Sequence, residues 1–247
     1  MRNLIPLILL ASACSNADGS SDADTSAGDL RCDEPAAITC LDELILRLGM
    51  HGDRVSDGEV TSVDQGDYFE STVDARAGGF GQSDNNPWLY VRFTDQGLEK
   101  VEIDDETALE DMSWHIAAKR FILRLNGGTS GPSCVAAAPF LERDFEDLTQ
   151  VPDGVRFFQD DFMLDDCTII NDSSGLPDSP QVALSAWWSY PGCVATSGVP
   201  FLIQLEDGRM VRLVVDTYYA QGQETCNVNN NPGSDGALLG WRWSFVP

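Results

Sequence analysis

Residues 201–215 read FLIQLEDGRMVRLVV, with two mainly apolar runs on either side of the turn sequence Asp207-Gly208. The second run places Arg212 between apolar residues, which is the alternation expected of a half-buried strand. Asp-Gly between two such runs is the strongest short-range signal for a β-hairpin. The sequence therefore predicts an antiparallel hairpin at residues 201–215.

Further strands are predicted on both sides of this hairpin, because their segments are rich in aromatic and β-branched residues or alternate in polarity. They are residues 88–93, 98–103, 114–125 and 238–245. The first two flank Asp95-Gln96-Gly97 and predict a second hairpin, while Trp241 and Trp243 would share one face of the last strand. We therefore predict an all-β, mostly antiparallel single domain with one short helix near residues 41–48.

The amino-terminal end has the features of a secretion signal. One arginine, a short apolar run and small residues up to Cys14 identify residues 1–13 as a signal peptide, since a transmembrane helix needs roughly 20 apolar residues. The sequence Ala11-Ser12-Ala13-Cys14 resembles a bacterial lipobox and also satisfies the small-x-small rule of ordinary secretion. We predict export to the cell envelope with a lipid anchor on Cys14 in the outer membrane. Plain secretion is the alternative.

The segment that follows the predicted cleavage site has nothing to bury. Residues 14–30 consist mainly of Ser, Asp, Ala and Gly, a composition that is typical of a flexible tether. The folded domain is therefore expected to occupy residues 31–247 and to stand clear of the membrane.

The cysteine count indicates disulfide bonds. The chain has seven cysteines, so lipid on Cys14 would leave an even six. An even set behind a signal peptide is typical of disulfides in an oxidising compartment, whereas zinc sites use close pairs such as C-x-x-C. The sequence leaves the connectivity open, and our predicted pairs are Cys32–Cys40, Cys193–Cys226 and the remaining Cys134–Cys167.

Charge and motif content exclude several classes of function. The chain has 15 basic and 40 acidic residues, a net charge of −25, and no run of clustered Lys and Arg. Binding to nucleic acid or to anionic lipid by charge needs such a cluster, so neither partner is expected. The chain has two histidines, lacks a G-x-S-x-G motif, and its acidic clusters lack the pattern of a calcium loop. We predict neither a catalytic site nor a metal site.

Two stretches resemble a known family. Residues 113–121 read SWHIAAKRF and residues 125–131 read LNGGTSG. Together they resemble the signature of the HmuY-like lipoproteins, in which a Trp-Asp-Ile-Ala-like strand leads into an Asn-Gly-Gly-Thr-Ser-Gly turn. Residues 88–93 and 201–215 resemble the early strand and the late hairpin of that family, so the similarity covers residues 59–247.

This resemblance implies a mostly β, haem-binding protein that is attached to the outer membrane or secreted. Its implied function is to bind haem, or a similar hydrophobic ligand, without catalysis. The alternative is an envelope lipoprotein of the same fold that binds protein or glycan, including other envelope proteins, and has lost haem binding.

The candidate ligands of a haem iron are His115 and Met163. Haem iron is commonly held by His, Met, Cys or Tyr, and His115 stands where the signature of the family usually carries Asp. A hydrogen-bonded core imidazole is the favoured interpretation of His115. For Met163, which lies in an aromatic stretch, a place in the apolar core is favoured over ligation.

Overall fold

The computed structural model describes residues 31–174, 176 and 179–247. The predicted signal peptide at 1–13, the predicted lipidation site Cys14 and the predicted tether at 14–30 lie outside the described residues. Across the described part of the chain, no helix combines the length and the apolar composition needed to cross a membrane.

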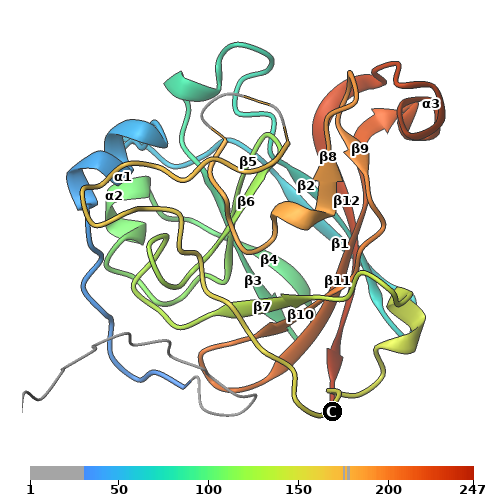
Figure 1. Ribbon diagram of the computed structural model, residues 1–247, viewed down its shortest axis with the longest axis horizontal. Coiled ribbons are helices and arrows are strands. Elements are labelled where there is room, and N and C mark those ends of the chain that lie inside the picture. The colour runs from blue at the N-terminus through green and yellow to red at the C-terminus, as the bar shows by residue number, and fades with distance from the viewer. Residues whose placement is uncertain (1–30, 175, 177–178) are drawn as a thin grey trace, which may run out of the picture.

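Two antiparallel sheets pack against each other through a common core (Figure 1). The larger sheet has the order β1 (Val60–Asp64), β2 (Phe69–Asp74), β12 (Ser234–Val246), β11 (Met210–Gln221), β10 (Phe201–Gln204) and β7 (Ala136–Pro139). The smaller sheet has the order β4 (Gly97–Val101), β3 (Leu89–Thr94), β5 (Ile116–Lys119) and β6 (Ile122–Leu125). A short pair consists of β8 (Trp188–Ser189) and β9 (Ala195–Thr196). The predicted fold class, mostly antiparallel β, is confirmed.

Both predicted hairpins are present. Strands β10 and β11 pair antiparallel from Phe201 opposite Leu213 to Gln204 opposite Met210. Gly208 in their turn has φ +86°, a left-handed conformation that glycine adopts without steric cost. Strands β3 and β4 form the second hairpin, which closes at Thr94 and Gly97.

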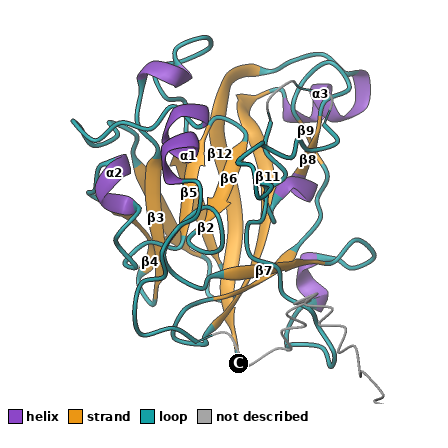
Figure 2. Ribbon diagram, turned by 60° about the vertical axis from the view of Figure 1, so that its left-hand side comes forward, coloured by secondary structure: helices purple, strands orange, loops and turns teal. Residues whose placement is uncertain are grey.

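Helices are few and short (Figure 2). The predicted helix is α1 (Leu41–Arg47), and two more were not predicted, α2 (Asp105–Ala108) and α3 (Gln223–Asn229). Three single 3₁₀ turns are η1 (Ser83–Asn85), η2 (Phe145–Asp147) and η3 (Ser185–Trp187).

The prediction of one continuous strand at residues 114–125 is wrong. The chain forms β5, turns at Arg120 and Phe121, and returns as β6, with Lys119 opposite Ile122. Arg120 has φ +57°, which a non-glycine residue rarely adopts. The sequence did not reveal this turn, because neither of its two residues is the Gly, Asn or Asp that usually supplies a positive φ.

The core has two main clusters. The first lies between the sheets and includes Leu125 of the small sheet with Trp241 and Trp243 of β12. These two tryptophans share one face of the strand, as predicted, and both are almost fully buried. The second lies on the other face of the small sheet, where α1 and α2 cover it (Figure 2). Leu44 of α1 and Trp88 belong to this second cluster.

All six predicted disulfide cysteines are paired, but two of the three predicted pairs are wrong. The bonds are Cys32–Cys134, Cys40–Cys167 and Cys193–Cys226, and the last of these is the predicted one. The pairs Cys32–Cys40 and Cys134–Cys167 do not form, because the amino-terminal segment lies along distant parts of the fold. The N–H of Ala36 donates to the carbonyl of Pro132, which brings that segment beside Cys134.

Candidate functional site

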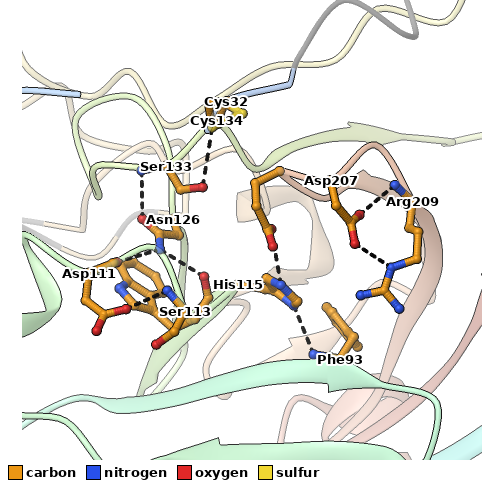
Figure 3. A network of polar contacts seen from close by, with 12 residues as sticks. Cys32, Phe93, Asp111, Ser113, His115, Asn126, Ser133, Cys134, Asp207 and Arg209 are labelled. Carbon is orange, nitrogen blue, oxygen red and sulfur yellow. Dashed lines mark hydrogen bonds and ion pairs between the residues drawn. A yellow bond between two sulfur atoms is a disulfide. The ribbon is translucent and has the colours of Figure 1, made fainter. Parts of the chain in front are cut away.

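His115 lies immediately before β5 and is almost fully buried. Its Nδ1 accepts a hydrogen bond of 2.9 Å from the N–H of Phe93 (Figure 3), and its Nε2 lies 3.2 Å from a carboxylate oxygen of Glu206. Because Nδ1 accepts, the proton of the neutral ring belongs on Nε2, where it faces Glu206. Both nitrogens therefore have partners within the protein, as the favoured interpretation of His115 expects.

Met163 is buried in the second core cluster, whereas His115 stacks on Phe93 of the first. The structure does not bring the two candidate haem ligands into a common site. The depression beside Met163 also contains Asp161, Asp165 and Asp166, and among its described lining residues there is no basic side chain that would offset their repulsion of the haem carboxylates. The role of either residue as a haem ligand stays a prediction.

The turn at residues 125–131 has a structural role. Asn126 is fully buried, donates to the carbonyls of Asp111 and Trp114, and accepts from the N–H of Ser133 (Figure 3). A Cβ on Gly128 would lie 2.0 Å from the carbonyl oxygen of Asp160, so only glycine fits this close backbone contact. These contacts show that the family-like motif specifies the fold at this corner.

A buried ionic cluster holds the small sheet to α2. Asp105 is fully buried and accepts hydrogen bonds from the backbone N–H groups of His51 and Trp88 and from the hydroxyl of Tyr90. The Arg124 guanidinium, also fully buried, donates to the Tyr90 hydroxyl at 3.3 Å and lies 4.3 Å from the centre of the Trp88 ring. Burial raises the pKa of Asp105 and of Tyr90.

Two more buried titratable groups have shifted pKa values. Burial lowers the pKa of Lys119 to about 8, and its ammonium donates to the carbonyl of Gly49 at 2.9 Å. Burial also raises the pKa of Asp160 to about 6, although its carboxylate accepts from the N–H groups of Leu125 and Ala183. These groups connect strands to loops and are enclosed by the core, so we assign them to folding.

A cleft of about 640 Å³ opens at one end of the two sheets. Its lining comes from segments that are far apart in sequence: residues 54–58, the loop after β2, the β5–β6 turn and the start of β12. The loop after β2 is the turquoise loop at the top of Figure 1. Three of the arginines, Arg54, Arg76 and Arg120, line this cleft, and we call it the arginine cleft.

The three arginines differ in their partners. Arg76 forms a two-point ion pair with Asp74, at 2.8 and 2.6 Å, and this hydrogen bonding raises its pKa. Arg54 donates to the main-chain carbonyl of Asn85. Arg120 donates to the carbonyl of Gly236 at 3.2 Å and more weakly to that of Arg76. Within the described part of the chain, Arg54 and Arg120 form no ion pair, so their charges are available to an anionic ligand.

The rim of the cleft includes an exposed aromatic side chain on a glycine-rich loop. Phe80 is 95% exposed, and it sits in the sequence Gly78-Gly79-Phe80-Gly81. All three glycines have a positive φ. An exposed phenylalanine on such a loop gives the cleft an aromatic surface next to its arginines.

Sequence reasoning missed this site. The arginines are separated by at least 22 positions in the chain, since Arg54 precedes Arg76 and Arg120 lies further on, so no basic cluster is visible in the sequence. The glycine-rich stretch around Phe80, in a chain with only 15 basic residues, was the available signal.

Comparison with known protein families identifies the family of this chain. The HmuY protein family matches residues 84–231, more than half of the sequence. This chain belongs to the HmuY family. The match includes Arg120 and ends before the start of β12, while Arg54, Arg76 and Phe80 precede it.

Solved structures that resemble the chain are distant in sequence. A candidate lipoprotein from Bacteroides fragilis is 14% identical with a TM-score of 0.44, covering 78% of this chain and 97% of that chain. A candidate HmuY-like haem-binding protein from Bacteroides vulgatus is 16% identical with a TM-score of 0.41, covering 76% and 91%. The apo HmuY analogue of Tannerella forsythia is 16% identical with a TM-score of 0.39, covering 79% and 100%. No curated protein matches the chain.

Proposed function

We propose that this protein is a lipid-anchored envelope protein that binds haem, or a similar planar hydrophobic ligand, in the arginine cleft. The chain belongs to the HmuY family, and its resemblance to the characterised members implies haem binding without catalysis. The observation that carries the proposal is the cleft itself, about 640 Å³, with Arg54, Arg120 and the exposed Phe80 around it. Ligand pockets in proteins usually have volumes of roughly 300–1,000 Å³.

The chemistry of the lining suits an amphipathic ligand with carboxylates. A guanidinium can donate two parallel hydrogen bonds to a carboxylate, which orients the ligand as well as attracting it. An aromatic side chain offers its face to a flat ring. Such a ligand is anionic at one edge and apolar over its faces, and haem is one example.

The two candidate ligands, His115 and Met163, are poorly placed to bind the iron of haem. His115 would have to lose its contact with Phe93 or Glu206 before a ring nitrogen could reach a metal. Met163 is packed in the second core cluster and does not line the arginine cleft. We therefore derive no step of binding from an iron bond to these residues.

The test is an absorbance titration of the purified domain with haemin. We expect a saturable shift of the Soret band at micromolar ligand, weakened in Arg54→Gln and Arg120→Gln. The matched control is Arg92→Gln, because Arg92 is a half-exposed arginine that pairs with Glu99 outside the cleft. Absence of a saturable shift would end the proposal.

The second candidate function is an envelope protein that binds protein or glycan and has lost haem binding. It is favoured by one observation: both nitrogens of His115, a candidate axial ligand, are engaged inside the fold. The same titration separates the two functions, because this candidate predicts no saturable Soret shift.

Attachment to the membrane is part of the proposal and has its own test. The support is the signal-peptide pattern that ends at Cys14 and the even number of cysteines that remain, all of them paired. The mass of the mature amino terminus should include acyl chains on Cys14. An unmodified amino-terminal cysteine, or cleavage elsewhere, would favour plain secretion.

A further inference from the structure

We propose that the arginine cleft recognises the carboxylates and the ring face of a tetrapyrrole, with no bond between the protein and the metal. Metal-free porphyrin should therefore bind with an affinity similar to that of haemin. This inference rests on the proposed function and narrows it to a ligand class. It follows from which side chains surround the cleft and from how the residues able to ligate iron are engaged.

The residues that line the cleft supply charge and an aromatic surface. Arg54 donates to a main-chain carbonyl, and Arg120 donates to main-chain carbonyls and lies over the ring of Tyr218. Neither arginine forms an ion pair with a described residue, whereas Arg76 is neutralised by Asp74. Two guanidinium groups are thus available for the two carboxylates that a porphyrin such as protoporphyrin IX carries. Asp57 and Asp235 also line the cleft, and the negative charge of Asp235 contributes to the raised pKa of Arg76.

Among the described residues, none that lines the cleft is His, Met, Cys or Tyr, the usual ligands of haem iron. The histidine nearest in sequence, His51, contacts the carbonyl oxygen of Asp84 through Nε2 at 2.9 Å. The six described cysteines are all in disulfides.

Tyr218 is the tyrosine beside the cleft, and it is unsuited to bind iron. The Arg120 guanidinium lies 5.9 Å from the centre of its ring, and the side chain is 3% exposed. Burial raises its pKa to about 12, which disfavours the phenolate form that binds iron.

The consequence is that the affinity for a tetrapyrrole should not depend on its metal. Haemin and protoporphyrin IX share the same ring and the same two carboxylates, and they differ in the iron. If no protein atom bonds to the iron, the two should bind with similar affinity. The dimethyl ester of protoporphyrin IX keeps the ring and loses both charges, so it should bind more weakly.

The experiment compares these three ligands on the wild-type domain, using quenching of tryptophan fluorescence so that all are measured alike. We expect Kd values for haemin and protoporphyrin IX within about threefold of each other. The ester should bind about tenfold more weakly, since two partly exposed ion pairs at roughly 0.7 kcal/mol each correspond to that factor.

Variants then test whether the arginines are responsible. The double variant Arg54→Gln/Arg120→Gln should weaken haemin and protoporphyrin IX equally, by about tenfold, and should no longer distinguish the ester. Arg92→Gln should leave all three affinities unchanged. His51→Gln and Met163→Leu, which preserves core volume, should leave the Soret band of bound haemin unchanged.

The outcomes separate this inference from the function on which it rests. Haemin binding at least tenfold tighter than protoporphyrin IX, or a Soret change in His51→Gln or Met163→Leu, would overturn the inference and leave haem binding in place. Ester binding as tight as that of the free acid would overturn the role of the arginines. Binding of no tetrapyrrole at all would overturn the proposed function as well.

Discussion

Arg120 should destabilise the fold through its backbone, and replacing it by glycine or alanine measures that cost. It occupies the first position of the two-residue turn between β5 and β6, at φ +57°. For a residue with a Cβ, the left-handed conformation costs roughly 1–2 kcal/mol. Arg120→Gly and Arg120→Ala both remove the hydrogen bond to Gly236, so their difference isolates the backbone.

The expected magnitude follows from two opposing effects. Glycine relieves the left-handed strain but costs roughly 0.5–1 kcal/mol, because it has more conformational freedom in the unfolded chain. Arg120→Gly should therefore have a free energy of unfolding about 1 kcal/mol higher than Arg120→Ala. Both variants should lose the same affinity for a carboxylate-bearing ligand, since both lack the guanidinium.

The assay is urea denaturation in a buffer that keeps the disulfides intact, followed by ligand titration of each variant. Equal stability of the two variants, or a more stable alanine variant, would show that the turn is unstrained and refute the reasoning. If Arg120→Gly is more stable than the wild type but binds the ligand more weakly, the backbone strain is retained because it positions the Arg120 side chain for binding.

Three further predictions concern the fold. Asp105→Ala should lower the free energy of unfolding by about 3 kcal/mol, because three donors lose their buried acceptor. The control is Asp104→Ala, which removes a helix cap and should lower it by about 1 kcal/mol. Equal losses in urea denaturation would contradict the role of Asp105 as a buried acceptor. Burial raises the pKa of Asp160 to about 6, so its protonated form stabilises the folded state at pH 4 and that stabilisation, about 3 kcal/mol, is lost as pH rises towards 7. Asp160→Asn should flatten this part of the pH dependence of unfolding, and a variant whose profile runs parallel to the wild type would argue against it. Removing the bridge in Cys40→Ser/Cys167→Ser, which spans 127 residues, should cost about 5 kcal/mol by loop entropy; a loss below about 1 kcal/mol would show that the amino-terminal segment is held by packing alone.

The turn of the HmuY-like signature at residues 125–131 and the proposed ligand site are separate parts of this molecule, although Arg120, in the preceding stretch of the signature, lines the cleft. The turn at residues 125–131 is held by Asn126 and by close backbone contacts at Gly128. The arginine cleft lies at the β5–β6 turn and the loop after β2, and two of its arginines precede the matched residues.

The sequence by itself determined the local elements. The hairpin at residues 201–215, the pair β3 and β4, and the shared face of Trp241 and Trp243 all follow from period-two patterns and turn residues within a few positions of each other. The helix α1 follows in the same way from its apolar spacing. Interactions between neighbours in the chain are sufficient to specify these features.

Only the tertiary structure decided the features that depend on residues far apart in the chain. The pairing of Cys32 with Cys134 and of Cys40 with Cys167 depends on where the amino-terminal segment lies on the fold. The arginine cleft exists because the ends of β2 and β5 and the start of β12 meet at one end of the two sheets. The turn at Arg120 carries no local signal at all, since the surrounding pairing of β5 with β6 imposes a conformation that the residue would not adopt alone.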